Sequence, residues 1–457
     1  MMLLILSIAI PLFGSALCLV LKPRAREACA IVLVAVSFIL TVLLIPAVMN
    51  GQTYWISLLN ADFFSVSFEL DKIGLVFALM FSLLGLVALI YSVNYIKENA
   101  NEYYFITTLL IGSLMGVAYS NNLILLYVFW EIAAFCTWRL IGFTRKAANI
   151  KIADKSFMMT LLGSSLMLLG FIFIYLQKGT LDLDLLRGQT LDSPELIFNL
   201  IFLGLIAKSV CLPIYTWLQD AHPVAPSPSS ALLSGIITKI GVLAFAKIWV
   251  STFNYTAQWV IPLAIISSII AGGAALVSSD MKKIIAYSTI SQIAYILFGF
   301  ALLNEFSTNA ALLYAFAHAL GKGGLFLGAG VVEKYFHTRD IRKLGGFIKV
   351  SPITGIGFLF CAASIAGIPP FGGFWAKLMI IMGLLTAGHI WIAVLAIFSA
   401  MLTLFYIWRL FDAVFVGDLK QKFDITLSKT MVTCVLILGI LSLLIGLFVS
   451  RFLLLVK

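Results

Sequence analysis

Long apolar runs recur along nearly the whole chain, and short polar or charged segments separate them. A helix of roughly 20 apolar residues crosses the hydrocarbon core of a bilayer while making all its backbone hydrogen bonds internally. The pattern therefore predicts an all-α polytopic membrane protein with about fourteen transmembrane helices. We expect these spans near residues 2–21, 28–49, 72–95, 103–120, 122–144, 154–176, 195–218, 228–250, 257–278, 283–303, 309–332, 350–387, 389–411 and 430–450.

Two of these spans contain residues that interrupt a helix. In the span at 195–218, Pro213 follows Lys208 by five residues, and a proline inside a helix removes a backbone hydrogen bond. We expect a break within about one turn of Lys208, with freed carbonyl groups facing its ammonium. The span at 350–387 repeats this arrangement before Lys377, with Gly367, Pro369, Pro370, Gly372 and Gly373. Paired broken helices are typical of ion sites in carriers with internal repeats.

Composition agrees with this class. Of the 457 residues, 62% are hydrophobic and 11% are charged, whereas a soluble domain has roughly 25% charged residues. The net charge of +10 is unevenly placed, with nineteen lysines and arginines in the loops on one side and five on the other. This asymmetry fits the positive-inside rule with both termini outside. The basic residues therefore indicate topology, and no nucleic-acid partner is expected.

The potential metal ligands are dispersed. Six cysteines and four histidines are scattered without a CxxC pair, so neither an iron–sulfur cluster nor a structural zinc site is expected. We expect no cofactor and no metal in this chain, and any electron transfer would occur in partner subunits. The first apolar run lacks a basic leader and a small-residue cleavage site, so we interpret it as a retained helix.

Charged residues inside the spans are the strongest functional signal. A charge at a helix centre costs roughly 2.5–3.5 kcal/mol unless it is paired or hydrated. Arg139 and Lys247 lie near span ends, where long side chains reach the interface, and we expect them to do so. The others are Glu131, Lys208, Lys239, Lys322 and Lys377.

Two interpretations of these charges remain open. Lys208 and Glu131 form an interhelical ion pair in the first, without a transport role. The second is a line of lysines that exchange protons, since one acid does not neutralise four lysines and burial favours the neutral amine. His318 lies one helical turn before Lys322 and would extend such a relay, although a single histidine of this kind more often only packs.

Several motifs carry a family resemblance. They are FWEI, LIAKSVCLPIYTWLQDAHPVAPSPSSALLSG followed by ITKIG, YSTISQIAYILFG, AHALGKGGLF, DIRKLGG and AGIPPFGGFWAK. With them the chain resembles the antiporter-like subunits shared by respiratory complex I (NADH:quinone oxidoreductase), Mrp-type cation/proton antiporters and membrane-bound energy-converting hydrogenases. The resemblance implies two inverted five-helix repeats, each with a broken helix.

The resemblance also implies residue roles. Glu131 and Lys208 would form the charged pair of the first half-channel, and Lys239 the central connector. His318 and Lys322 would link onward to Lys377, the terminal group on the exit side. Asp220 and His222 would lie at the cytoplasmic mouth, and Pro213, Pro369 and Pro370 at the helix breaks. Where the family has small polar residues, this chain has Arg139, which would pair with Glu131 or reach the interface.

The expected organisation follows the spans. It comprises the N-terminal helices (1–102), a first half-channel (103–250), a connector (251–282), a second half-channel (283–411), and a C-terminal loop and last helix (412–457). The chain ends soon after the last span, without the long lateral helix of one complex I subunit, which favours a compact member of the family.

We therefore expect a protein that translocates protons, or exchanges sodium for protons, within a large redox-driven complex of a prokaryotic inner membrane. An energy-converting hydrogenase-type complex is favoured, with other membrane subunits and a peripheral redox arm as partners. Iron–sulfur clusters and a nickel–iron or flavin and quinone centre would lie in those partners. The alternatives are one component of an Mrp-type sodium/proton antiporter, a stand-alone carrier and a passive scaffold.

Overall fold

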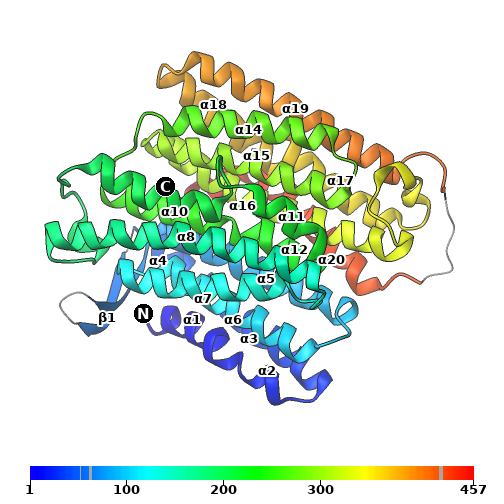
Figure 1. Ribbon diagram of the computed structural model, residues 1–457, viewed down its shortest axis with the longest axis horizontal. Coiled ribbons are helices and arrows are strands. Elements are labelled where there is room, and N and C mark those ends of the chain that lie inside the picture. Colours follow the sequence, from blue (N-terminus) through cyan, green and yellow to red (C-terminus); the bar gives the residue numbers. More distant parts are fainter. Residues whose placement is uncertain (52, 61–63, 421–425, 457) are drawn as a thin grey trace.

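The helices run roughly alongside one another in a single bundle (Figure 1). The computed structural model describes residues 1–51, 53–60, 64–420 and 426–456. Lys422 and Lys457, which are among the loop lysines counted above, lie outside these ranges. Both termini lie at the end of the bundle where strand β1 is found, on the left of Figure 1.

The N-terminal part and the first half contain most of the short elements. They are α1 (Met2–Gly14), α2 (Leu17–Val20), α3 (Pro23–Val42), α4 (Ile45–Met49), β1 (Tyr54–Asn60), β2 (Ser65–Leu70), α5 (Lys72–Tyr95), α6 (Ala100–Tyr119), α7 (Leu123–Ile141), α8 (Ala147–Lys178), α9 (Leu183–Leu186), α10 (Pro194–Ser209), α11 (Thr216–Val224), α12 (Ser227–Leu232), η1 (Leu233–Ile237), α13 (Lys239–Phe245) and η2 (Ala246–Thr252).

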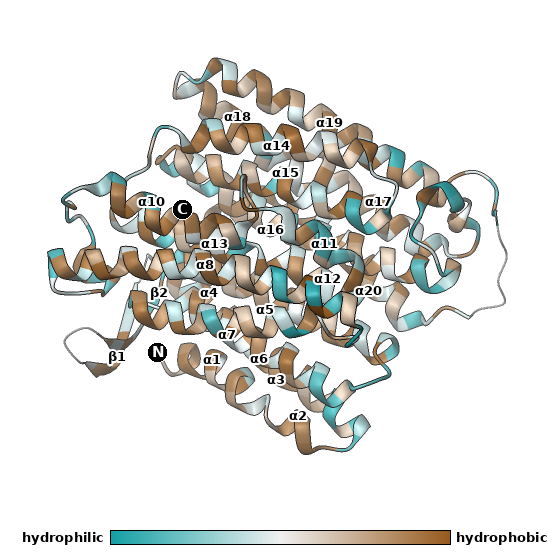
Figure 2. Ribbon diagram, viewed as in Figure 1, coloured by the Kyte–Doolittle hydropathy of each residue, from teal (hydrophilic) through white to brown (hydrophobic). Residues whose placement is uncertain are grey.

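The second half continues with longer helices. They are α14 (Val260–Val277), α15 (Met281–Ala301), α16 (Glu305–Phe336), η3 (Ile341–Lys343), η4 (Phe347–Lys349), α17 (Pro352–Ala366), α18 (Gly372–Thr386), α19 (Ile390–Phe415), α20 (Lys429–Leu447) and α21 (Val449–Val456). Figure 2 shows hydrophobic residues along most helices, with hydrophilic residues gathered in connecting segments and around α11 and α12.

The predicted number of spans is confirmed. In the described part of the chain, eleven helical segments are long and apolar enough to cross a membrane. Helix α6, with 20 residues, and the two interrupted helices α10–α11 and α17–α18 complete the fourteen. The protein is thus an all-α, multi-pass membrane protein.

One element was missed by the sequence analysis. The segment before α5, expected to be an acidic loop, forms an antiparallel hairpin of β1 and β2 in which Tyr54 pairs with Leu70. Its second strand alternates polar Ser65, Ser67 and Glu69 with apolar residues, which is the period of a strand. Six alternating residues beside a 24-residue apolar run are a weak signal, and the run dominated the interpretation.

Two halves of the bundle carry matching features at opposite ends. After α6, Leu123 N–H donates to Leu181 O at 3.0 Å, and Leu183 N–H donates to Asn121 O. After α14, Met281 N–H donates to Arg339 O and Ile341 N–H to Ser279 O, both at 2.9 Å. Each half therefore joins the start of its second helix to the end of its third, and the inverted placement agrees with the expected repeats.

The most buried helices are those that carry the inner lysines. The apolar windows of Ser227–Thr252 and of α16 are completely buried, and that of α15 is 94% buried. By contrast, the windows of Pro23–Met49 and α19 are 28% and 33% buried and form the periphery. Charges on the central helices are removed from lipid and surrounded by protein, where polar partners are available.

Candidate functional site

The first broken helix places Lys208 as predicted. Helix α10 ends at Ser209, and the next residue, Val210, has a φ of 57°. Lys208 is buried, its Nζ lies 5.8 Å from the centre of the Trp130 ring, and it has no hydrogen-bond partner among the described residues. The expectation that freed carbonyls face this ammonium is wrong, because Ala207 O accepts from Trp217 Nε1 at 2.9 Å instead.

Glu131 and Lys208 interact electrostatically but are not in direct contact. Glu131 is only partly buried, and its Oε1 also lacks a hydrogen-bond partner in the described structure. Its neighbours one turn away on α7, Val128 and Phe135, are 44% and 49% exposed. The acid therefore lies at the edge of an apolar outer surface of this chain.

Lys239 is positioned by a local widening of its helix. The segment η1 is a π-helix, in which backbone hydrogen bonds span five residues, and such turns often mark functional sites. Lys239 Nζ donates to Ser234 O at 2.5 Å, and the Ser234 hydroxyl bonds the Thr289 hydroxyl at 2.6 Å. The sequence analysis placed Lys239 in a regular helix and did not foresee this turn.

Lys322 and His318 lie on the buried face of α16. Lys322 Nζ donates to Ser288 Oγ at 2.5 Å and to Ile285 O at 3.1 Å. His318 interacts electrostatically with Lys239, Lys322 and Lys377, so all four side chains form one cluster. Neither ring nitrogen of His318 has a hydrogen-bond partner within the described ranges.

The second broken helix holds Lys377 more directly than the first holds Lys208. Lys377 Nζ donates to Ile365 O at 2.8 Å, a carbonyl freed by the end of α17 at Ala366. Its ammonium also lies 5.2 Å and 5.7 Å from the ring centres of Tyr295 and Tyr314. The break contains the Pro369–Pro370 bond, as the first contains Pro213, and here the prediction of carbonyls facing the ammonium is confirmed.

The two residues expected at the cytoplasmic mouth have different surroundings. Asp220 is partly exposed and makes an ion pair of 2.8 Å with Lys155. His222 is fully buried, stacks on Phe326 at a centroid distance of 4.2 Å, and has no hydrogen-bond partner in the described chain. His222 interacts electrostatically with Lys322, so it belongs to the inner cluster rather than to the surface.

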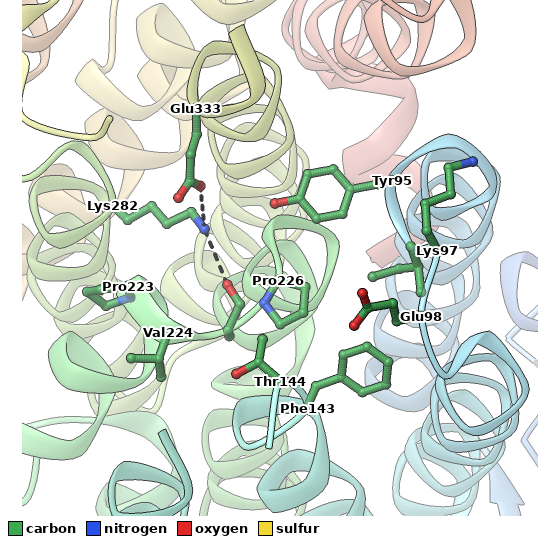
Figure 3. A pocket seen from close by; sticks show the side chains of 12 residues that line it. Tyr95, Lys97, Glu98, Phe143, Thr144, Pro223, Val224, Pro226, Lys282 and Glu333 are labelled. Carbon is green, nitrogen blue, oxygen red and sulfur yellow. Dashed lines mark hydrogen bonds and ion pairs between the residues drawn. The ribbon is translucent and has the colours of Figure 1, made fainter. Parts of the chain in front are cut away.

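A cavity of about 380 Å³ opens beside this histidine at the same end of the bundle. Figure 3 shows Lys282 bonded to Glu333 and to a backbone carbonyl at its edge, with Tyr95, Lys97 and Glu98 on the opposite wall. The Lys282–Glu333 ion pair is 2.9 Å long, and the carbonyl is that of Ala225, at 3.2 Å. The sequence analysis counted Lys282 as a loop residue, but only 2% of its side chain is exposed.

Two predictions about helix-end charges are wrong. Arg139 does not pair with Glu131, because its guanidinium binds both carboxylate oxygens of Glu102, on α6. Lys247 does not reach the interface either. It is 2% exposed, donates to Ala118 O at 2.9 Å, and lies 4.0 Å from the carboxylate of Asp71. The helices around each residue offer a partner that is closer than the membrane surface.

Polar residues missed by the sequence analysis line α15. Ser288, Ser291, Gln292 and Tyr295 recur at intervals of three and four residues within the motif YSTISQIAYILFG, and all are buried. That spacing places them on one helical face. The motif was used for the resemblance, but its polar face was the signal that could have identified these residues.

No metal centre is evident in the part of the chain that the structure describes. Within it, no three His, Cys, Asp or Glu side chains come together as a metal site, and the six cysteines are unpaired. The charged cluster is basic, which disfavours a cation ligand set. The arrangement is suited to holding and passing protons.

Broken helices in two inverted halves and a buried row of basic side chains define a polytopic, antiporter-like membrane protein. A family model described as NADH:quinone oxidoreductase/Mrp antiporter, transmembrane region, matches residues 120–403. The chain belongs to this family.

Curated relatives point to one branch. An Na⁺/H⁺ antiporter protein of Alkalihalophilus pseudofirmus is 32% identical over 438 residues, which cover 86% of this chain and 53% of that protein. The putative antiporter subunit mnhA2 of Staphylococcus saprophyticus is 33% identical over 422 residues, covering 82% and 52%. The chain thus spans about half the length of the curated relatives it matches.

Solved structures share the fold. A chain of the Mrp complex from Dietzia sp. DQ12-45-1b gives a TM-score of 0.93 at 23% identity, over 100% of this chain and 96% of that chain. The membrane-bound sulfane sulfur reductase, an archaeal respiratory complex, gives 0.89 at 25% identity, over 98% and 77%. Complex I from Thermus thermophilus gives 0.82 at 20% identity, over 98% of each chain.

Proposed function

We propose that the chain is a proton-translocating component of an Mrp-type sodium/proton antiporter. The observation that carries the proposal is the buried cluster of Lys239, His318, Lys322 and Lys377, which ends at a broken helix. The relatives named above favour the antiporter over the hydrogenase-type complex, which the sequence analysis had preferred.

The chemistry of the cluster suits sequential proton transfer. In the described structure, no carboxylate forms an ion pair with Lys239, Lys322 or Lys377, so simultaneous charge on all three would be strongly unfavourable. A proton on one lysine therefore raises the cost of a proton on the next. Glu131 supports Lys208 at the other end of the line and would set when that lysine is charged.

The assembly is part of the proposal. The exposed apolar surface around Glu131, with Val128 and Phe135, supports contact with another membrane protein of the complex. We propose a prokaryotic inner membrane with both termini outside, as the loop charges favour. The cytoplasmic mouth would then be the cavity beside Lys282 and His222, with Asp220 at its rim.

A redox-driven complex is the second candidate. The match to the sulfane sulfur reductase at 25% identity and 98% coverage of this chain supports it. Such a complex would place a peripheral arm with iron–sulfur clusters, and a nickel–iron or flavin and quinone centre, in partner chains. Mass spectrometry of chains that co-purify in mild detergent separates the two: only other hydrophobic subunits support the antiporter, and redox subunits contradict it.

The translocation role itself is tested by Lys322→Ala in the protein's native complex. We expect sodium/proton exchange by inverted membrane vesicles to fall to background while the complex assembles normally. Lys334→Ala is the matched control, because Lys334 lies on the same helix but bonds Asn94 O at an exposed end. Full exchange by Lys322→Ala would exclude the proposal, and so would an equal loss in both variants.

A further inference from the structure

A continuous chain of hydrogen bonds connects Lys322 with the surroundings of Lys377 without using His318. Lys322 Nζ donates to Ser288 Oγ, and the Tyr406 hydroxyl donates to the same oxygen at 2.9 Å. Gln292 Nε2 donates to Tyr406 Oη at 3.2 Å, and the Tyr314 hydroxyl donates to Gln292 Oε1 at 2.5 Å. Tyr314 is one of the two rings beneath the Lys377 ammonium.

The orientation of the Gln292 amide is set by its neighbours. Thr403 gives its own hydroxyl hydrogen to Ser399 O at 2.9 Å, so its oxygen is free only to accept. Gln292 Nε2 lies 3.0 Å from that oxygen and must therefore be the donor. The Tyr406 hydroxyl likewise gives its hydrogen to Ser288, so it also accepts from Nε2. The amide oxygen is left facing Tyr314.

An amide nitrogen in this orientation stops a proton. A hydroxyl takes a proton from one side and gives its own to the other, whereas an amide NH₂ group only donates. A proton released by the Lys322 ammonium could pass to Ser288 and on to Tyr406, each oxygen gaining one proton and losing one. It could not continue, because Gln292 presents Nε2 to Tyr406.

We propose that Gln292 is a proton valve between Lys322 and Lys377. It holds the Tyr406 and Tyr314 hydroxyls in place and couples the two lysines electrostatically, but it blocks direct hopping along the chain of hydrogen bonds. The inference rests on the proposed function. Without such a valve, a permanent wire in the second half of the protein would let protons leak down their gradient.

The decisive variant is Gln292→Glu, which keeps the shape but allows relay, since a carboxyl group accepts on one oxygen and donates from the other. In proteoliposomes with the native complex, we expect passive proton conductance under a potassium diffusion potential to rise several-fold. Adding Tyr406→Phe should abolish this leak because the next link is removed. Tyr91→Phe is the matched control: its buried hydroxyl bonds Leu327 O on α16, away from the chain, and its loss should not change the conductance.

Two results would overturn the valve: a Gln292→Glu complex as tight to protons as the parent, or a leak that persists with Tyr406→Phe. If Gln292→Glu does not assemble, Thr403→Val serves instead, because it removes the acceptor that orients Nε2. We expect a smaller leak from it, and a tight membrane would equally contradict the proposal. Failure of the valve is distinct from failure of the proposed function, since only the latter leaves Lys322→Ala fully active.

Discussion

Charged side chains in this protein are held by specific partners, and Arg139 shows how much one residue can contribute. Its guanidinium binds both oxygens of Glu102, which Arg145 also contacts from an exposed position. We expect Arg139→Ala to lower the free energy of unfolding by about 1–3 kcal/mol, because a partly buried carboxylate loses its main donor. Thermal unfolding of the purified protein measures this.

The control for that measurement is Arg145→Ala. Because the Arg145 side chain is 59% exposed, its removal should cost less than about 1 kcal/mol. Transport should persist in both variants, since neither residue contacts the lysine cluster. An Arg139→Ala protein of full stability that no longer transports would place Arg139 in the ion path instead.

Asp340, in the loop after α16, gives a pH dependence outside the membrane. The Arg342 guanidinium donates to both of its oxygens at 2.8 and 2.9 Å and lowers the pKa of Asp340 from 3.8 to about 2. The pKa is lowered in the folded protein, so this contact stabilises the loop fully above pH 3.8 and is lost as the pH falls through about 2. Carboxyl ¹³C shifts should show Asp340 titrating near 2, and nearer 3.8 in Arg342→Ala. Equal titration in the two proteins would refute the contact.

At the scale of elements, the second helix break depends on close approach between α17 and α18. A Cβ atom on Gly373 would lie 1.9 Å from Ser364 O, so any side chain would push the two half-helices apart. We expect Gly373→Ala to destabilise the protein by roughly 1–3 kcal/mol and to reduce transport, because Lys377 lies one turn further along α18.

Gly273→Ala in α14 is the matched change. Nothing lies within 4 Å of a Cβ at Gly273, so this variant should be neutral or gain up to about 1 kcal/mol from helix propensity. Comparing the melting temperatures of the two variants separates a packing effect from a general intolerance of alanine. Equal melting temperatures would show that α17 and α18 adjust without cost.

For the whole molecule, the proposed orientation is open to a labelling test. Asp418 and His389 are exposed at opposite ends of the bundle. In a background without the native cysteines, we expect an impermeant maleimide to label His389→Cys in intact cells, and Asp418→Cys only after the membrane is opened. The basis is the excess of loop lysines and arginines on the Asp418 side. The reverse pattern would invert the proposed path.

The sequence by itself determined the class of protein, the number of spans and the positions of both helix breaks. These properties depend on the length of an apolar run and on the missing N–H of proline, which are local features of the chain. The inner lysines could also be located, because a charge within an apolar run is visible without a structure. Lys208, Lys239, Lys322 and Lys377 are all buried, as their positions indicated.

Only the tertiary structure decided which groups meet. Lys247 meets Asp71 and Lys282 meets Glu333, and each pair joins elements far apart in the chain. Gln292 contacts Thr403 and Tyr314 on two other helices, which no spacing along α15 reveals. The rotation of each helix about its axis, and so the direction of every polar side chain, is set by packing against neighbours rather than by the apolar run itself.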